Sequence, residues 1–68
     1  MRNITAQAFK AYLEVQLSSK YNMFSQYAIY ETGLDEVTYK DIQKYYKKLV
    51  EQYRDNEECE ELLNELGY

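Results

Sequence analysis

The segment from Tyr39 to Tyr53 has the clearest amphipathic pattern in the chain, and most of its large apolar positions are tyrosines. At the 100° turn per residue of an α-helix, these positions fall within an arc of about 140°. They are Tyr39, Ile42, Tyr45, Tyr46, Leu49, Val50 and Tyr53. A tyrosine ring packs like an apolar side chain, but its hydroxyl needs water or a hydrogen-bond partner. We therefore expect this helical face to suit an interface at least as well as a sealed core.

Four segments of the chain have the three-and-four spacing of apolar residues that is typical of helices, and none has the alternation of a strand. The predicted helices cover residues of about 4–18, 23–32, 36–54 and 57–66. The chain has no proline, no internal repeat and no Gly/Ser-rich linker. Residues 1–68 are therefore predicted to form a single all-α domain, a small bundle of four helices.

Each predicted helix follows residues whose side chains can accept a hydrogen bond from the N–H groups of the first turn. These candidate caps are Asn3 or Thr5, Asn22, Asp35 or Thr38, and Asn56 or the pair Asp55 and Glu58. Gly33 and Gly67 are expected to end the second and fourth helices in the left-handed conformation. In that arrangement the residue after the glycine packs back on the helix, and the expected contacts are Ile29–Leu34 and Leu63–Tyr68.

A chain of 68 residues can bury only a small core. Ordering it costs roughly 1.5 kcal/mol per residue, which burial only just offsets at this size. Small domains therefore often rely on disulfides, metals or self-association. Cys59 is the only cysteine and histidine is absent. The chain therefore cannot form an internal disulfide, and it lacks the Cys and His spacings of the familiar zinc sites. Self-association remains, and we predict a homodimer.

The single cysteine also bears on the location of the protein, because unpaired thiols fit a reducing cytoplasm. The N-terminus lacks the unbroken apolar run of a signal peptide, and no stretch approaches the ~18 apolar residues of a membrane span. We therefore predict a cytoplasmic protein without a membrane partner.

The chain offers few residues for reaction chemistry. Without histidine, the commonest general base near neutral pH is missing, and no glycine-rich phosphate loop occurs. Cys59 lies among Glu57, Glu58, Glu60 and Glu61, whose negative charges should raise the pKa of the thiol and lower its reactivity. We expect no catalytic residue, no cofactor and no metal, and hence a protein that is not an enzyme.

Acidic residues are concentrated at the C-terminal end of the chain. The net charge is −4, and residues 55–68 contain six acidic and no basic residues, so the preceding 54 residues sum to +2. One interpretation is that Glu57, Glu58 and Glu61 contact a partner, and in the extreme case imitate DNA phosphates in a basic groove. The other is that these side chains only solubilise the last helix and stabilise its N-terminus.

Large aromatic side chains are concentrated in and just before the second predicted helix. Aromatic residues and methionine are enriched in the contact patches of protein interfaces. Together with two tyrosines of the third helix, the predicted partner-binding residues are Tyr21, Met23, Phe24, Tyr27, Tyr30, Tyr45 and Tyr46. The alternative is that the short second helix simply fills the groove between the first and third helices.

Two ligands other than a protein are also compatible with the composition. A tyrosine-lined pocket between subunits could stack a nucleotide, with Arg2, Lys20 or Arg54 meeting its phosphate. Nucleic acid could bind the lysine stripe of the third helix. That stripe consists of Lys40, Lys44, Lys47 and Lys48. We do not expect nucleic acid to be the partner, because the lysines lie opposite the aromatic face and the net charge is negative.

Residues 20–50 resemble a pattern in short, largely uncharacterised bacteriophage proteins. The shared positions are Tyr21-Asn22-Met23-Phe24, Ala28, Thr32-Gly33-Leu34, Tyr39-x-x-Ile42 and Tyr46. The resemblance implies a phage or mobile-element protein that acts in a bacterial host, and it implies no catalytic residue. By analogy with such proteins, we predict stoichiometric binding, and inhibition, of a host protein such as a defence or nucleic-acid enzyme.

Overall fold

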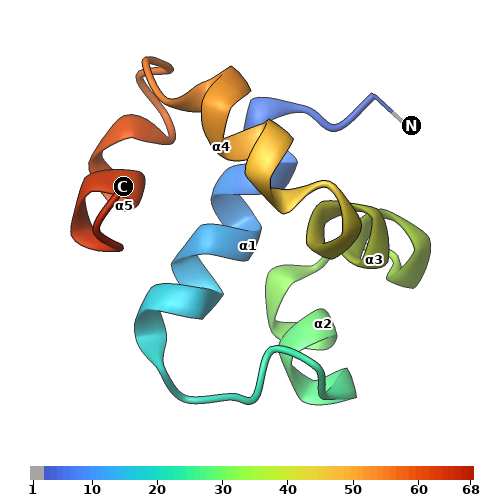
Figure 1. Ribbon diagram of the computed structural model, residues 1–68. Coiled ribbons are helices and arrows are strands. Elements are labelled where there is room, and N and C mark those ends of the chain that lie inside the picture. The colour runs from blue at the N-terminus through green and yellow to red at the C-terminus, as the bar shows by residue number, and fades with distance from the viewer. Residues whose placement is uncertain (1–2) are drawn as a thin grey trace.

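The computed structural model describes residues 3–68, and this part of the chain contains five helices and no strand (Figure 1). The helices are α1 (Ala6–Ser18), α2 (Gln26–Thr32), α3 (Glu36–Lys44), α4 (Tyr46–Tyr53) and α5 (Glu60–Glu65). The predicted all-α class is confirmed. No helix within residues 3–68 has the length and apolar run needed to cross a lipid bilayer.

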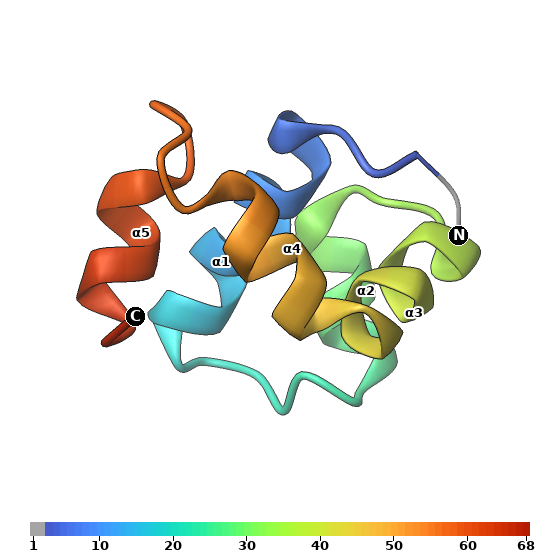
Figure 2. The same ribbon diagram turned by 45° about the horizontal axis from the view of Figure 1, so that its top comes forward.

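Helix α1 is the central element of the fold. It packs against α2, α3 and α5, and in both views α5 lies on one side of it while α2 and α3 lie on the other (Figures 1 and 2). The buried residues are Ile4, Phe9, Tyr12, Leu13, Val15, Ala28, Ile29, Tyr39, Ile42, Leu49, Val50, Cys59 and Leu63. These side chains are buried within a single copy of the chain, so the homodimer stays a prediction.

The segment predicted as one helix over 36–54 forms two helices that meet at Tyr45. The backbone of Tyr45 leaves the helical region, with φ −109° and ψ 25°. The bend turns the tyrosine face around α1, because rings from both halves contact aromatic residues of α1. Tyr39 of α3 contacts Tyr12, with ring centroids 5.0 Å apart, whereas α4 places tyrosine rings against both Phe9 and Tyr12.

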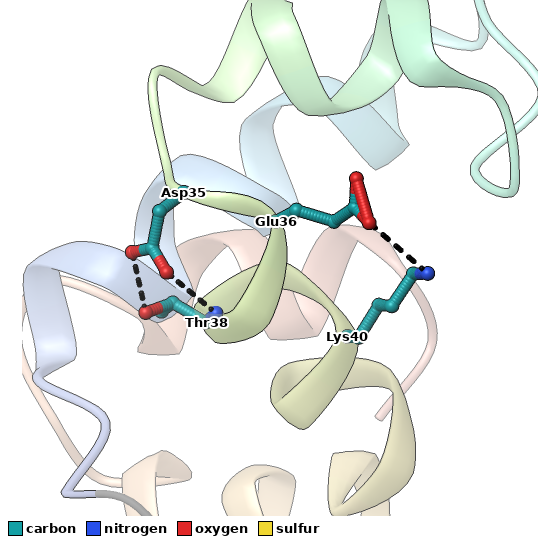
Figure 3. A network of polar contacts seen from close by, with 4 residues as sticks. All are labelled: Asp35, Glu36, Thr38 and Lys40. Atoms are coloured by element: carbon teal, nitrogen blue, oxygen red, sulfur yellow. Dashed lines mark hydrogen bonds and ion pairs between the residues drawn. The ribbon is translucent and has the colours of Figure 1, made fainter.

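Helices α1 and α3 begin at predicted caps. The hydroxyl of Thr5 accepts a hydrogen bond from the Ala8 N–H at 3.1 Å. The carboxylate of Asp35 accepts one from the Thr38 N–H at 3.1 Å and another from the Thr38 hydroxyl at 2.7 Å (Figure 3). Both arrangements satisfy N–H groups that have no partner within the first turn of the helix.

Helices α2 and α5 begin three residues later than predicted. Asn22 does not cap α2, because its side-chain oxygen accepts the Phe24 N–H within a turn. Ser25 caps the helix instead and accepts the Ala28 N–H at 3.4 Å. Asn56 likewise accepts the Glu58 N–H at 2.8 Å, and a turn over 57–59 precedes α5. In both places an asparagine side chain bonds two residues ahead, which favours a turn over immediate helix.

The C-terminal ends of α1 and α2 share one hydrogen-bond arrangement. In α2 the Thr32 hydroxyl donates to the Ile29 carbonyl at 2.6 Å and accepts the Leu34 N–H at 3.1 Å. In α1 Ser18 connects the carbonyl of residue 15 to the N–H of residue 20 in the same way, at 2.6 and 3.4 Å. In a Schellman motif this N–H would donate directly to this carbonyl. Here a side-chain hydroxyl lies between them and bonds to both.

Both glycines occupy the predicted left-handed positions. Gly33 has φ 74° and Gly67 has φ 95°. After Gly67, the Tyr68 N–H donates to the Leu63 carbonyl at 3.0 Å, so the predicted return of Tyr68 onto Leu63 is present in the backbone. Leu34 is partly buried against the core cluster that contains Ile29.

Candidate functional site

The structure separates the residues predicted to bind a partner into three groups. Phe24, Tyr27 and Tyr30 are exposed, whereas other apolar candidates are partly buried against the core. These partly buried residues are Tyr21, Met23, Tyr45 and Tyr46. The exposed acidic candidates are Glu57, Glu58 and Glu61. They lie in and before α5, on the opposite side of α1 from α2, so a single contact surface does not include both the acidic and the exposed aromatic residues (Figures 1 and 2).

Phe24 is the most exposed large apolar side chain, with 85% of its surface accessible to solvent. It directly precedes the Ser25 cap of α2, a position from which an apolar residue often packs on the fourth residue of the helix. That residue is Ile29, which is buried in the core. Because Phe24 remains exposed, its ring contributes little to the burial that stabilises the fold.

The backbone around Phe24 is fixed by the turn in which it lies. The Phe24 N–H donates to the Asn22 side chain, and the Ser25 N–H donates to the Asn22 carbonyl, both at 2.9 Å. The neighbouring Met23 carbonyl accepts hydrogen bonds from the Tyr39 hydroxyl and from the Gln43 side-chain amide, the latter at 2.9 Å. Two side chains of α3 thus anchor the turn that exposes Phe24.

Tyr39 connects this turn to the core. The residue is 1% exposed, and its ring contacts the Tyr12 ring. Burial, with a smaller contribution from Tyr12, raises the pKa of Tyr39 to about 12. The phenol is therefore protonated at neutral pH and donates its proton to the Met23 carbonyl.

Two further exposed rings lie on α2. Tyr27 is 72% and Tyr30 is 73% exposed, and they lie on the side of α2 opposite the buried Ala28 and Ile29. Residues three apart on a helix are neighbours on its surface. We call Phe24, Tyr27 and Tyr30 the α2 aromatic surface.

A groove of about 360 Å³ lies beside Phe24. We call it the aromatic groove, and its lining residues are Tyr12, Gln16, Met23, Phe24, Gln43 and Tyr46. The Tyr46 hydroxyl donates to the Gln16 side-chain oxygen at 2.9 Å, so two polar groups of the lining already satisfy each other. The groove therefore combines aromatic walls with few unpaired polar groups, as is common where apolar side chains bind.

Tyr46 belongs mainly to the interior. Its ring centroid lies 5.8 Å from that of Phe9 and 6.0 Å from those of Tyr12 and Tyr68. Burial, followed by the hydrogen bond and the proximity of the Tyr68 phenol, raises the pKa of Tyr46. Tyr53 has a similar role, because its ring contacts Phe9 and its hydroxyl donates to the Ile4 carbonyl. The α4 tyrosines thus largely stabilise the fold.

Tyr45 lies where the aromatic face meets the lysine stripe. The ammonium groups of Lys44 and Lys48 lie 5.4 and 6.0 Å from the centroid of the Tyr45 ring. The prediction that tyrosines and lysines lie on opposite sides is therefore wrong at this residue. The reason is that Tyr45 sits at the edge of the predicted arc and at the bend between α3 and α4, where its ring can reach the lysines.

The acidic end contains a shallow hollow but no metal-binding cluster. Glu57, Glu60, Glu61 and Asn64 line a space of about 380 Å³. Within residues 3–68, no three His, Cys, Asp or Glu side chains lie close enough to hold a metal ion. Cys59 is fully buried, and its thiol donates to the Ala6 carbonyl at 3.5 Å.

The pKa of the Cys59 thiol is raised, as the sequence predicts, but burial is the main cause. The Glu58 carboxylate raises this pKa further, whereas Lys10 lowers it. The thiolate is therefore disfavoured at neutral pH, which lowers the nucleophilicity of the sulfur. The neighbouring acidic residues in the sequence indicated the direction of the pKa shift. Its larger cause, burial of the thiol, could not be read from the sequence because it depends on how the chain folds.

The cations suggested for a nucleotide phosphate do not converge. Lys20 lines a hollow between α1 and α2 together with Tyr21 and Glu31. Arg54 lines a different hollow, of about 160 Å³, beside Tyr46 and Tyr68. Arg2 lies outside the described residues. Lys20 and Arg54 therefore line separate hollows of the described chain, and a nucleotide pocket between subunits stays a prediction.

Comparisons of the chain with protein families, curated proteins and solved structures gave no match. The resemblance of residues 20–50 to phage proteins consequently stays a prediction.

Proposed function

We propose that this protein is a binding module that acts stoichiometrically on another protein through the α2 aromatic surface and the aromatic groove. The observation that supports this most strongly is the exposure of Phe24, 85%, on a turn fixed by hydrogen bonds on both sides. A large apolar side chain that the fold leaves in solvent, at a fixed position, is suited to enter a pocket on a partner.

The fixed backbone of the turn matters for affinity. Binding restricts side chains at the interface. The free-energy cost of this lost conformational entropy is about 0.5–1.5 kcal/mol for each immobilised side chain that has many rotamers. Phe24, Tyr27 and Tyr30 have only two side-chain torsions before the hydroxyl, and their backbones are already ordered in α2 or its preceding turn. Their contact area is therefore available at a small entropic cost.

The cellular setting is part of the same proposal. The resemblance to phage proteins suggests that the partner is a bacterial host protein, such as a defence or nucleic-acid enzyme, and that binding inhibits it. The lone thiol of Cys59 supports a cytoplasmic location. The acidic residues around α5 would then steer the partner electrostatically as it approaches. They would not take part in the contact made by the α2 aromatic surface.

Affinity capture from a bacterial lysate tests this proposal. The tagged chain, the double variant F24A/Y27A and the control V37A are compared, because Val37 is also an exposed apolar residue, 57%, outside the α2 aromatic surface. We expect one host protein to be retained by the natural chain and by V37A but lost by F24A/Y27A. Retention of the same protein by all three chains would contradict the proposed surface.

A further inference from the structure

Three lysines surround a second hollow at the bend between α3 and α4. The hollow has a volume of about 330 Å³ and is lined by Gln43, Lys44, Tyr45, Tyr46, Lys47 and Lys48. We call it the lysine hollow. Lys44 and Lys48 both lie within 6.0 Å of the centroid of the Tyr45 ring. Two ammonium groups close to one ring repel each other, although the ring partly offsets this through cation–π attraction.

The lysines of this hollow lack carboxylate partners within residues 3–68, where the only ion pair joins Glu36 to Lys40 at 3.3 Å (Figure 3). Lys40 belongs to the same stripe but is thus already paired. Lys44, Lys47 and Lys48 form no such pair, although the protein has twelve acidic residues. Their exposed ammonium groups are therefore available to an anionic group of a partner.

The lysine hollow continues the surface proposed to bind a partner. Gln43 and Tyr46 line both the lysine hollow and the aromatic groove, and Phe24 lines the groove but not the hollow. A single extended or helical segment can therefore contact apolar walls at one end and ammonium groups at the other. Such an arrangement selects a segment that has both apolar and acidic side chains.

The other anionic occupants fit less well. Nucleic acid binding depends on many phosphate contacts, whereas this hollow has three lysines on a chain of net charge −4. The chain's own α5 is acidic and leucine-rich, but Leu63 is buried and Leu62 and Leu66 pack against the core. A second copy could not offer those leucines without opening its own fold.

From these contacts we propose that the partner is recognised through a peptide segment in which Asp or Glu lies beside large apolar residues. The carboxylates of this segment contact Lys44, Lys47 and Lys48, and its apolar side chains occupy the aromatic groove next to Phe24. This inference rests on the proposed function, because it names the chemistry of the segment that the same surface binds.

The test begins with a displayed library of random peptides, selected on the immobilised full chain. The hollow variant K44Q/K47Q/K48Q removes three exposed charges, and the matched control K20Q/K40Q/R54Q removes three exposed charges elsewhere. Binding of the most enriched peptide, labelled with a fluorophore, is measured by anisotropy. We expect acidic residues beside large apolar ones in the enriched peptides, and about tenfold weaker binding by the hollow variant than by the control.

Several results would overturn this inference. They are the enrichment of peptides without acidic residues, the enrichment of none, and equal binding by the hollow variant and its matched control. The F24A variant separates the inference from the proposed function. If F24A binds the acidic peptide as tightly as the natural chain does, the α2 aromatic surface is contradicted while the lysine hollow retains its assignment.

Two further measurements examine the other occupants. A dimer mass in light scattering that K44Q/K47Q/K48Q reduces to one chain would assign the hollow to a second copy. An electrophoretic shift of a single-stranded oligonucleotide that the same variant abolishes would assign it to nucleic acid. Either result would overturn the inference, whereas a monomer that leaves the oligonucleotide unshifted supports a protein segment as the occupant.

Discussion

The hydroxyl of Tyr39 donates a hydrogen bond to the main-chain carbonyl of Met23, sixteen residues earlier in the chain. Tyr39 is buried in the core, whereas Phe24, the neighbour of Met23, is almost fully exposed. One side chain thus connects the packed interior to the turn that positions the most exposed aromatic residue. The fold and the proposed binding surface are consequently coupled at this bond.

Replacing Tyr39 by Phe should weaken both stability and partner binding. The ring remains, but the Met23 carbonyl keeps only its bond from Gln43, so we expect unfolding to be easier by about 1 kcal/mol in urea titrations. Tyr53→Phe is the matched control, because it removes a bond to the Ile4 carbonyl far from the turn. If both variants lost the same stability and bound the partner equally well, Tyr39 would have no special role in positioning Phe24.

The neighbouring residues Tyr45 and Tyr46 should respond very differently to replacement by Ala. Tyr46 contacts three other aromatic rings, so its removal should cost about 3 kcal/mol, a large part of the stability of a domain this small. Tyr45 lies near two lysines at the surface, and its removal should cost about 1 kcal/mol. Chemical denaturation measures both, and equal costs would show that the aromatic cluster is not centred on Tyr46.

Stability should decrease at alkaline pH because buried phenols resist ionisation. Burial raises the pKa of Tyr39 from 10.0 to about 12, and it raises that of Tyr12 as well. The folded state therefore holds protons that the unfolded state releases, so this contribution is complete below pH 10 and is lost as the pH rises through about 12.

The unfolding free energy measured by urea titration at pH 9 and at pH 11 checks this expectation. Between the two pH values, each such phenol removes up to about 1.4 kcal/mol of stability per pH unit. In Tyr39→Phe the decrease should be smaller than in the natural chain. An unchanged decrease in that variant would show that other groups are responsible.

Opposite changes are expected at the equivalent end positions of α1 and α2. Ser19 and Gly33 both follow a helix in the left-handed conformation, with φ 57° and 74°. Ser19→Gly should stabilise the fold by up to about 1 kcal/mol, whereas Gly33→Ala should destabilise it by about 1 kcal/mol through backbone strain. Thermal unfolding of the two variants checks the signs, and a loss of stability in Ser19→Gly would contradict the expected relief of strain.

The helices could be predicted from the sequence because apolar spacing and caps such as Thr5 and Asp35 are local signals. The start of α2 could not be predicted, since Asn22 and Ser25 are both good caps. Asn22 instead bonds within the turn that precedes α2, and the Met23 carbonyl of that turn accepts two bonds from α3 that local patterns do not indicate. The bend at Tyr45 likewise has no proline or glycine to indicate it, and it arises where tyrosines of both halves pack on α1.

The aromatic residues of the candidate site were predicted as a group, but their separate roles were not. Helical periodicity places Tyr46 on an apolar face without showing whether another ring will cover it, and Phe9 and Tyr12 do so. Phe24 lies outside α2, in a turn whose direction depends on bonds from α3. Tertiary packing therefore decides which aromatic residues remain available to a partner.

The most direct test of the proposed binding role is a paired measurement on Phe24→Ala, in which unfolding by urea and capture of a protein from a bacterial lysate are quantified on the same preparation. Because Phe24 is 85% exposed, we expect the unfolding free energy to remain within about 0.5 kcal/mol of the natural value. Capture should decrease at least about tenfold, as for an aromatic residue at the centre of an interface. Undiminished capture, or a loss of several kcal/mol of stability, would contradict the conclusion that this ring serves binding rather than folding.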